Sequence, residues 1–113
     1  TTSTSYVDAT NFNLSITPTS ASSKILVLLT VQQGGSGTTR AFVAVYRGAN
    51  LVAETGMARI ANVDYHVALH KLDSPNTTNE ITYQVRHKVN TGASIIRQTT
   101  GFNSYLTLME IAG

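Results

Sequence analysis

Apolar and polar residues alternate with a period of two along most of this 113-residue chain. This spacing places apolar side chains on one face of an extended segment and is typical of half-buried β-strands. The clearest example is the segment 81–89, where one face carries Ile81, Tyr83, Val85, His87 and Val89. No segment shows a convincing helical pattern. The alternation therefore restricts the chain to an all-β fold.

Further strands are expected wherever the alternation recurs, at residues 12–16, 41–47, 51–54, 63–71, 94–98 and 105–111. The segment 24–32 differs, because it begins apolar on both faces, which is the pattern of a central strand covered on both sides. Turn-forming residues separate these segments. Those at 48–50 and 90–92 predict β-hairpins, and those at 73–76 predict a tight turn around Pro75.

Eight or nine short strands with no internal repeat predict a single antiparallel sandwich or barrel. A chain of this length normally forms one domain, here residues 1–113, and can bury a core without disulfides. The segments 24–32 and 105–111 are expected to lie in that core, since both are rich in aliphatic or aromatic residues.

The charge pattern and the length of the apolar runs make two kinds of partner unexpected. The eight Lys and Arg residues are scattered along the chain, whereas a nucleic-acid binder groups them along one element, so no nucleic-acid partner is expected. The longest aliphatic run, at residues 25–29, is far shorter than the ~20 residues needed to cross a bilayer, so no membrane insertion is expected.

The chain has no cysteine, which leaves neither disulfides nor thiolate metal ligands.

No residue pattern predicts catalysis, so we expect a protein that is not an enzyme and that carries no cofactor. Serine and histidine occur without a Gly-x-Ser-x-Gly elbow. The six acidic residues lie mostly at expected strand ends or turns, so no facing carboxylate pair of the glycosidase type is favoured. The glycine-rich run at residues 34–37 lacks the lysine and the following helix of a phosphate-binding loop.

His66 and His70 are four residues apart, a spacing that on a helix would bring both rings to one metal ion. In a strand the same spacing separates the two residues by ~13 Å on one face, so they cannot share a metal within one chain. A symmetry axis beside this strand would instead gather equivalent histidines from several copies around one ion. The alternative is that both are simply the polar face of a strand.

Four stretches of the chain together resemble one known family. They are residues 1–8 (TTSTSYVD), 16–27 (ITPTSASSKILV), 72–78 (LDSPNTT) and 106–113 (LTLMEIAG). In this order they resemble the C-terminal domain of tail-fibre-like and related virion surface proteins of tailed bacteriophages, of the type common among aquatic phages. The resemblance spans essentially the whole chain, and the serine-rich turn before Lys24 is its most specific element.

The resemblance implies a jelly-roll-like β-sandwich that forms a homotrimer, contacts other virion proteins and is exposed on the particle. A fibre or spike domain of this kind would attach the virion to a bacterial surface glycan or protein, usually as the last module of a longer chain. A capsid decoration protein is the alternative if the 113 residues are the whole protein. A free lectin-like module is the second alternative. The family carries no catalytic motif.

Loops are expected to make the contacts with a partner, because loops carry binding residues on a rigid scaffold. The candidate loops are residues 33–40, 56–62 and 99–104. The residues expected to contact a partner are Gln33, Ser36, Thr38, Thr39, Arg40, Arg59, Asn62, Thr100 and Asn103.

Overall fold

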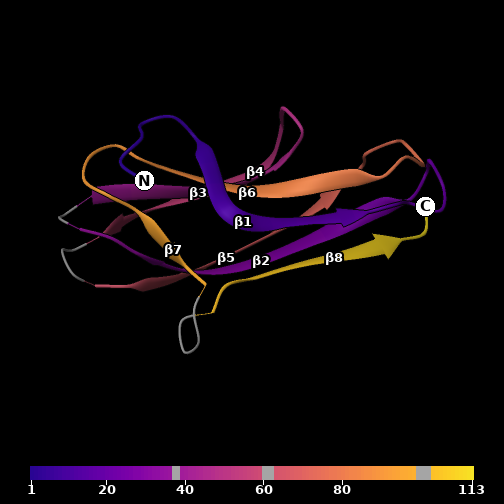
Figure 1. Ribbon diagram of the computed structural model, residues 1–113. Helices are drawn as coiled ribbons and strands as arrows, with labels where there is room; N and C mark the ends of the chain where they lie inside the picture. The colour runs from indigo at the N-terminus through magenta and orange to yellow at the C-terminus, as the bar shows by residue number, and fades with distance from the viewer. Residues whose placement is uncertain (37–38, 60–62, 99–102) are drawn as a thin grey trace.

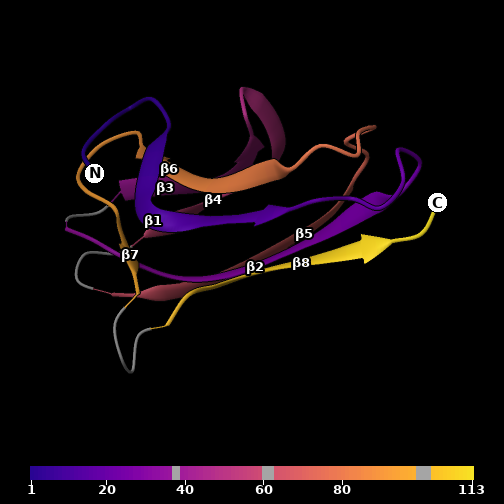
Figure 2. The same ribbon diagram turned by 45° about the vertical axis from the view of Figure 1, so that its right-hand side comes forward.

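The structure, a computed structural model, describes residues 1–36, 39–59, 63–98 and 103–113. Two antiparallel sheets pack face to face and form a β-sandwich (Figure 1, Figure 2). The described residues form eight strands: β1 (Val7–Ile16), β2 (Lys24–Gly34), β3 (Thr39–Arg47), β4 (Asn50–Arg59), β5 (Tyr65–Asp73), β6 (Ile81–Val89), β7 (Ile95–Arg97) and β8 (Tyr105–Ile111). Within these ranges no helix is long and apolar enough to span a membrane. The predicted all-β sandwich is confirmed.

Sheet A has the strand order β1-β6-β3-β4, and sheet B is built around β2. β5 pairs with one edge of β2, whereas β8 and then β7 pair with the other edge. Eight strands have seven connections, and two of these, β3–β4 and β7–β8, stay within one sheet, so the chain crosses between the sheets five times. This repeated crossing gives the sandwich its jelly-roll-like character.

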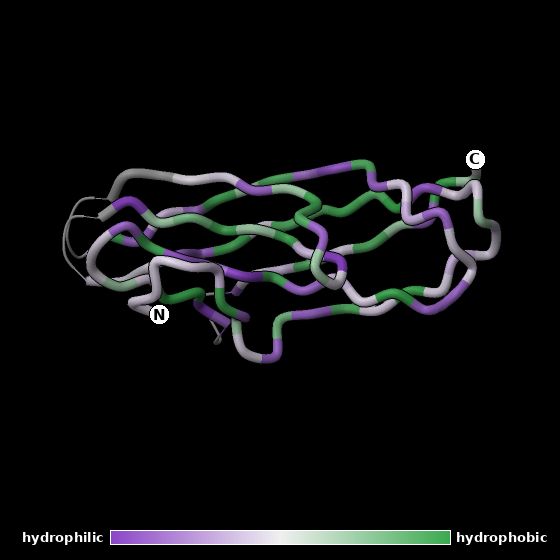
Figure 3. Tube along the Cα trace, turned by 90° about the horizontal axis from the view of Figure 1, so that it is seen from above, coloured by the Kyte–Doolittle hydropathy of each residue, from purple (hydrophilic) through white to green (hydrophobic). Residues whose placement is uncertain are grey.

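The core lies between the two sheets and is built from the alternating positions that the sequence indicates. Its main contributors come from β2, β3 and β6, and none is more than 2% exposed: Ile25, Val27, Leu29, Val31, Val43, Val45, Tyr83 and Val85. Figure 3 shows the alternation as apolar and polar colours that follow one another along the strands. Burial of each such side chain stabilises the fold by about 1.5–3 kcal/mol, so the inner faces hold the two layers together.

An ion pair and a tyrosine join the two sheets inside the sandwich. Asp73 of β5 accepts hydrogen bonds from Arg47 Nε at 2.8 Å and from the Tyr83 hydroxyl at 2.7 Å. Burial alone would raise the pKa of Asp73, but these hydrogen bonds and the charge of Arg47 lower it. Asp73 therefore links the layers, while Asn76 forms the predicted turn with a φ of 55° and a hydrogen bond to the Ser74 carbonyl.

β1 bends because it contains a large β-bulge (Figure 2). Asp8 pairs with Arg86 and Asn13 pairs with Gln84, so residues 9–12 lie opposite a single residue of β6. The side-chain amide of Gln84 donates hydrogen bonds of 2.8–3.2 Å to the carbonyls of Ala9, Phe12 and Val85. The bulge interrupts the hydrogen bonding between β1 and β6. The Gln84 amide therefore supplies hydrogen-bond donors to carbonyl groups of the bulge that have no partner in β6.

The serine-rich turn between β1 and β2 is tied to β8. Glu110 Oε2 accepts hydrogen bonds from the backbone nitrogen of Thr19 at 2.8 Å and from its hydroxyl at 2.7 Å. Hydrogen bonds from Ser23 and Thr19 lower the pKa of Glu110. The serine-rich turn is thus held by β8.

One of the two predicted hairpins is confirmed. β3 and β4 pair across residues 48–50, with Gly48 at a φ of 61°. The hairpin predicted at residues 90–92 is wrong, because β7 leaves sheet A and pairs with β2 of sheet B. Ser94 explains the crossing: its backbone bonds to Thr1, and its hydroxyl bonds to Gln33 and His87 inside the sandwich.

The expectation that residues 24–32 and 105–111 lie in the core is only half correct. The inner face of β2 is buried, but Leu28 on its outer face is 37% exposed. Leu106 and Leu108 of β8 pack against the core, whereas Tyr105, Met109 and Ile111 are exposed. Both differences have one cause, because no other described element covers the outer surface of sheet B.

Candidate functional site

The two outer surfaces of the sandwich differ in chemistry. The outer surface of sheet A, called face A, carries a cluster of aromatic and charged side chains: Tyr6, Asp8, Phe42, Tyr46, Glu54, Arg86 and Lys88. The strand register brings them together, since Phe42 of β3 lies opposite Lys88 of β6. Alternate residues of both strands therefore point outward side by side.

The rings and cations of the face A cluster contact one another directly. Tyr6 and Tyr46 meet edge to face, with ring centroids 5.7 Å apart. The Arg86 guanidinium carbon lies 4.4 Å from the Tyr46 ring centroid. Lys88 Nζ lies 4.5 Å from the Tyr6 centroid and 5.2 Å from that of Phe42. Each such contact is worth about 0.5–1 kcal/mol at an exposed site, so the side chains hold one another in place.

Two carboxylates balance the two cations of the cluster. Arg86 Nε lies 2.8 Å from Asp8 Oδ1, and the Tyr6 hydroxyl donates to Glu54 Oε2 at 2.7 Å. Burial and the hydrogen bond to Glu54 raise the pKa of Tyr6, so its hydroxyl stays a donor. A pre-ordered patch of rings and hydrogen-bonding groups with balanced charge suits a hydroxyl-rich ligand better than a polyanion.

The outer surface of sheet B, called face B, is formed by outward residues of β2, β5, β7 and β8. Pairing across the sheet aligns them in rows, of which the three central ones are Leu72–Leu26–Met109, His70–Leu28–Thr107 and Ala68–Thr30–Tyr105. Lys24 and Ile111 lie beyond these rows at one end, and His66, Gln32 and Arg97 at the other. The outward residues of these four strands include no carboxylate.

Exposed apolar side chains gather on face B. In the part of the chain that the structure describes, ten large hydrophobic side chains are exposed. Six of them belong to face B: Leu28, Leu72, Ile95, Tyr105, Met109 and Ile111. Their exposure runs from 37% for Leu28 to 60% for Tyr105. Grouped exposed apolar side chains on a folded domain mark a candidate interaction surface, and among the described residues they are most concentrated on face B.

Gln33, predicted to contact a partner, does not lie in a loop. β2 continues through Gly34, and the Gln33 side chain is fully buried. Its Nε2 donates to Ser94 Oγ at 2.7 Å, and its Oε1 has no hydrogen-bond partner among the described residues. The prediction that Gln33 lies in a loop and contacts a partner is wrong. The two glycines that follow Gln33 are typical of a loop, but strand β2 continues through the first of them.

The other predicted contact residues fall into three groups. Ser36 and Asn103 are exposed and lie outside the strands, so their role stays a prediction. Thr39, Arg40 and Arg59 belong to strands β3 and β4, which makes the loops at 33–40 and 56–62 shorter than expected. The remaining candidates lie outside the described residues: Thr38, Asn62 and Thr100.

His66 and His70 lie exposed on β5 and point outward on face B, as the alternation predicts. Within the described ranges, no group of three His, Cys, Asp or Glu residues could hold a metal ion. A site shared between copies stays a prediction. Asp73, the last residue of the same strand, accepts hydrogen bonds from Arg47 and Tyr83.

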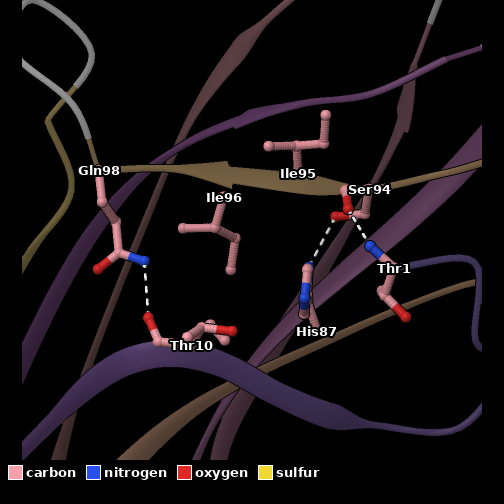
Figure 4. Close-up of a pocket in the computed structure, with 8 residues that line it drawn as sticks. Thr1, Thr10, His87, Ser94, Ile95, Ile96 and Gln98 are labelled. Atoms are coloured by element: carbon pink, nitrogen blue, oxygen red, sulfur yellow. Dashed lines mark hydrogen bonds between the residues drawn. The ribbon is translucent and has the colours of Figure 1, made fainter.

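A cavity of about 230 Å³ lies between β1 and β7 (Figure 4). Gln98 Nε2 donates to the Thr10 carbonyl at 3.1 Å on one side of it. On the other side His87 and Thr1 both bond to Ser94 (Figure 4). The polar groups on each side of the cavity are thus hydrogen-bonded to one another.

His87 and Ser94 resemble a base beside a nucleophile, with 3.1 Å between His87 Nδ1 and Ser94 Oγ. Ser94 is fully buried, however, and its other side-chain partner is the amide of Gln33 instead of an acid. Burial lowers the pKa of His87 to about 4, far from the neutral range in which a general base works best. The pair is better explained as a hydrogen-bonded polar element of the interior.

No protein-family model matches this chain, and no curated protein sequence matches it. The class that the structure defines is therefore the fold itself, a two-layer antiparallel β-sandwich.

Proposed function

We propose that this chain is a non-enzymatic domain on the outside of a bacteriophage particle. In this proposal it forms a trimeric fibre or spike domain that attaches the virion to a glycan or protein of the bacterial surface. The family resemblance of the sequence supports the virion location. The β-sandwich supports it too, since it is a rigid scaffold of the kind on which binding surfaces are displayed.

The observation that carries the attachment role is the face A cluster. Its two tyrosines, with Arg86 and Lys88 against them, form an ordered polar and aromatic patch on the open side of sheet A. Tyrosine is favoured at recognition sites because it offers a large contact area at a low cost in conformational entropy. Arginine is likewise enriched where partners bind.

Binding of the purified domain to a panel of bacterial strains and immobilised surface glycans tests this proposal. The double variant Tyr46→Ala/Arg86→Ala is expected to weaken binding at least about tenfold, which corresponds to ~1.4 kcal/mol. The matched control is Lys71→Ala, which removes an exposed cation of β5 and should leave binding unchanged. Melting curves of all three proteins establish that they are folded.

Two results would overturn the attachment role. One is that the folded natural chain binds no member of the panel. The other is that the double variant binds as tightly as the natural chain, which would mean that face A is not the contact surface.

A capsid decoration protein is the second candidate, and face B favours it. A decoration protein stabilises a shell by burying part of its surface against neighbouring subunits, and face B offers exposed apolar side chains for that purpose. The number of copies per purified virion separates the two candidates. Hundreds of copies indicate decoration, and a few tens or fewer indicate a fibre.

A further inference from the structure

We infer that face B is covered by other copies of this same chain, so that the domain self-associates through the outer surface of sheet B. The inference names the contact surface of the assembly proposed above. It does not rest on attachment to bacteria, because self-association and cell binding are read by different measurements.

One row of face B is apolar across the three strands β5, β2 and β8. Leu26 of β2 lies between Leu72 of β5 and Met109 of β8, so one row consists of three large apolar side chains. In the next row Leu28 is flanked by His70 and Thr107. Leu72 and Met109 are 45% and 49% exposed, whereas Leu69 and Leu108, on the inward faces of the same strands, pack against the core. Water is therefore left in contact with a surface whose burial would be favourable.

The charged groups of face B lie at its ends. Lys24 opens β2 and pairs with Ile111 at one end of the sheet. Arg97 is opposite Gln32 near the other end, and its Nε lies 2.8 Å from Asp64 Oδ2. Copies that meet through the central rows leave both groups near the rim, where water can solvate them. This is the anatomy of a protein interface, with an apolar centre and a polar border.

The size of face B predicts a small interface between copies. β5, β2 and β8 lie ~4.8 Å apart, each residue advances ~3.4 Å, and all three strands are paired over the six residues 25–30 of β2, so the flat area that they share is about 300 Å². The accessible area is larger than this flat projection because side chains corrugate the surface. The flat area is well below the ~800 Å² that each partner buries in a standard interface, so the interface is a small one and is expected to form at high protein concentration.

A second copy is the occupant that the chemistry favours. Each copy presents the same apolar rows, so copies can match apolar surface to apolar surface without another component. A strongly charged partner finds no matching set of charges, because the central rows contain no lysine, arginine or carboxylate. Low charge in the centre also removes the repulsion that identical surfaces otherwise suffer when they meet.

The oligomeric state of the purified chain tests the inference, measured by light scattering and sedimentation from about 1 μM to about 100 μM, where an interface of modest quality dissociates. The natural chain is expected to form a closed oligomer. The variant Leu28→Lys/Met109→Lys, which places two charges in the apolar rows, should raise the dissociation constant at least about 100-fold. Both side chains are exposed in the single chain, so the variant should keep its fold, which circular dichroism checks.

The control is Leu14→Lys/Leu51→Lys, two leucines of β1 and β4 that are 43% and 46% exposed outside face B. This variant should associate like the natural chain. A natural chain that stays monomeric at every concentration overturns the inference. So does an oligomer that survives the face B substitutions but dissociates with the control ones.

Discussion

His87 sits on the inner face of β6, where the period-two pattern places it, and the fold keeps its ring neutral. Burial lowers the pKa of His87 to about 4 from an ordinary value of 6.5. Between these two values the unfolded chain binds a proton that the folded chain does not, so the free energy of unfolding must fall as the pH falls. Below about pH 4 both states are protonated, and this contribution levels off.

We predict that His87 makes the folded chain lose up to about 3 kcal/mol of stability between pH 7 and pH 4. The variant His87→Gln, which cannot take up the proton, should show a correspondingly flatter profile in urea unfolding at pH 7, 6, 5 and 4. His66→Gln, which replaces an exposed histidine of β5, is the control and should keep the slope of the natural chain. Equal slopes for His87→Gln and the natural chain would contradict the prediction.

Single residues differ in how far the sequence alone places them. The position of His87 on a buried face follows from alternation with its neighbours. Its partner does not follow, because Ser94 lies in the connection to β7 of the other sheet, where its hydroxyl also accepts a hydrogen bond from Gln33 of β2. Local composition predicts the wrong environment for Gln33, because a polar residue before two glycines is typical of a loop. The three-dimensional structure shows that Gln33 is buried and that its side-chain amide donates a hydrogen bond to Ser94.

At the level of strands, the β1 bulge depends on one side chain. Gln84 donates to three carbonyls of the bulge and of its own strand. We predict that Gln84→Ala lowers the free energy of unfolding by about 1–3 kcal/mol, because these carbonyls lose their protein donor. Gln84→Glu should be worse, since a carboxylate places acceptors against acceptors.

Urea unfolding of both Gln84 variants measures this effect. Thr82→Ala, at the preceding outward position of β6, is the matched control and should cost less than either. If Gln84→Glu proves as stable as the natural chain, the bulge does not depend on the amide.

The sequence predicts the position of a strand wherever apolar and polar residues alternate along its whole length. It does not predict which other strand that strand pairs with. The segments of β5, β6 and β8 agree closely with the pattern, and so does the β3–β4 hairpin. The turn-forming residues at 90–92 predict a hairpin between β6 and β7, and Gly92 does adopt a φ of 76°. The actual pairing of β7 with β2 depends on hydrogen bonds from Ser94 to distant residues, which no local pattern reports.

On the scale of the whole molecule, the sandwich presents two outer faces with different surfaces. Face A is polar, aromatic and balanced in charge, whereas face B carries six exposed large apolar side chains. The sequence contained a sign of face B, since residues 24–32 begin apolar on both faces. That sign indicates a covered strand but cannot say whether the cover comes from the same chain or from another one.

Face A had no comparable sign in the sequence. Its residues come from β3, β4, β6 and the start of the chain, and they meet only because sheet A has the order β1-β6-β3-β4. Strand order is set by long-range pairing and not by local propensity, so the cluster emerges only in three dimensions.

Hydroxyl-radical footprinting of the natural chain tests the division between the two faces most directly, because both faces carry reactive side chains. Met109 and Tyr105 report on face B, and Tyr6 and Tyr46 report on face A. Between dilute and concentrated protein, oxidation of Met109 and Tyr105 should fall several-fold while oxidation of Tyr6 and Tyr46 stays constant. Unchanged oxidation on face B, or protection of the two tyrosines on face A, would contradict the account.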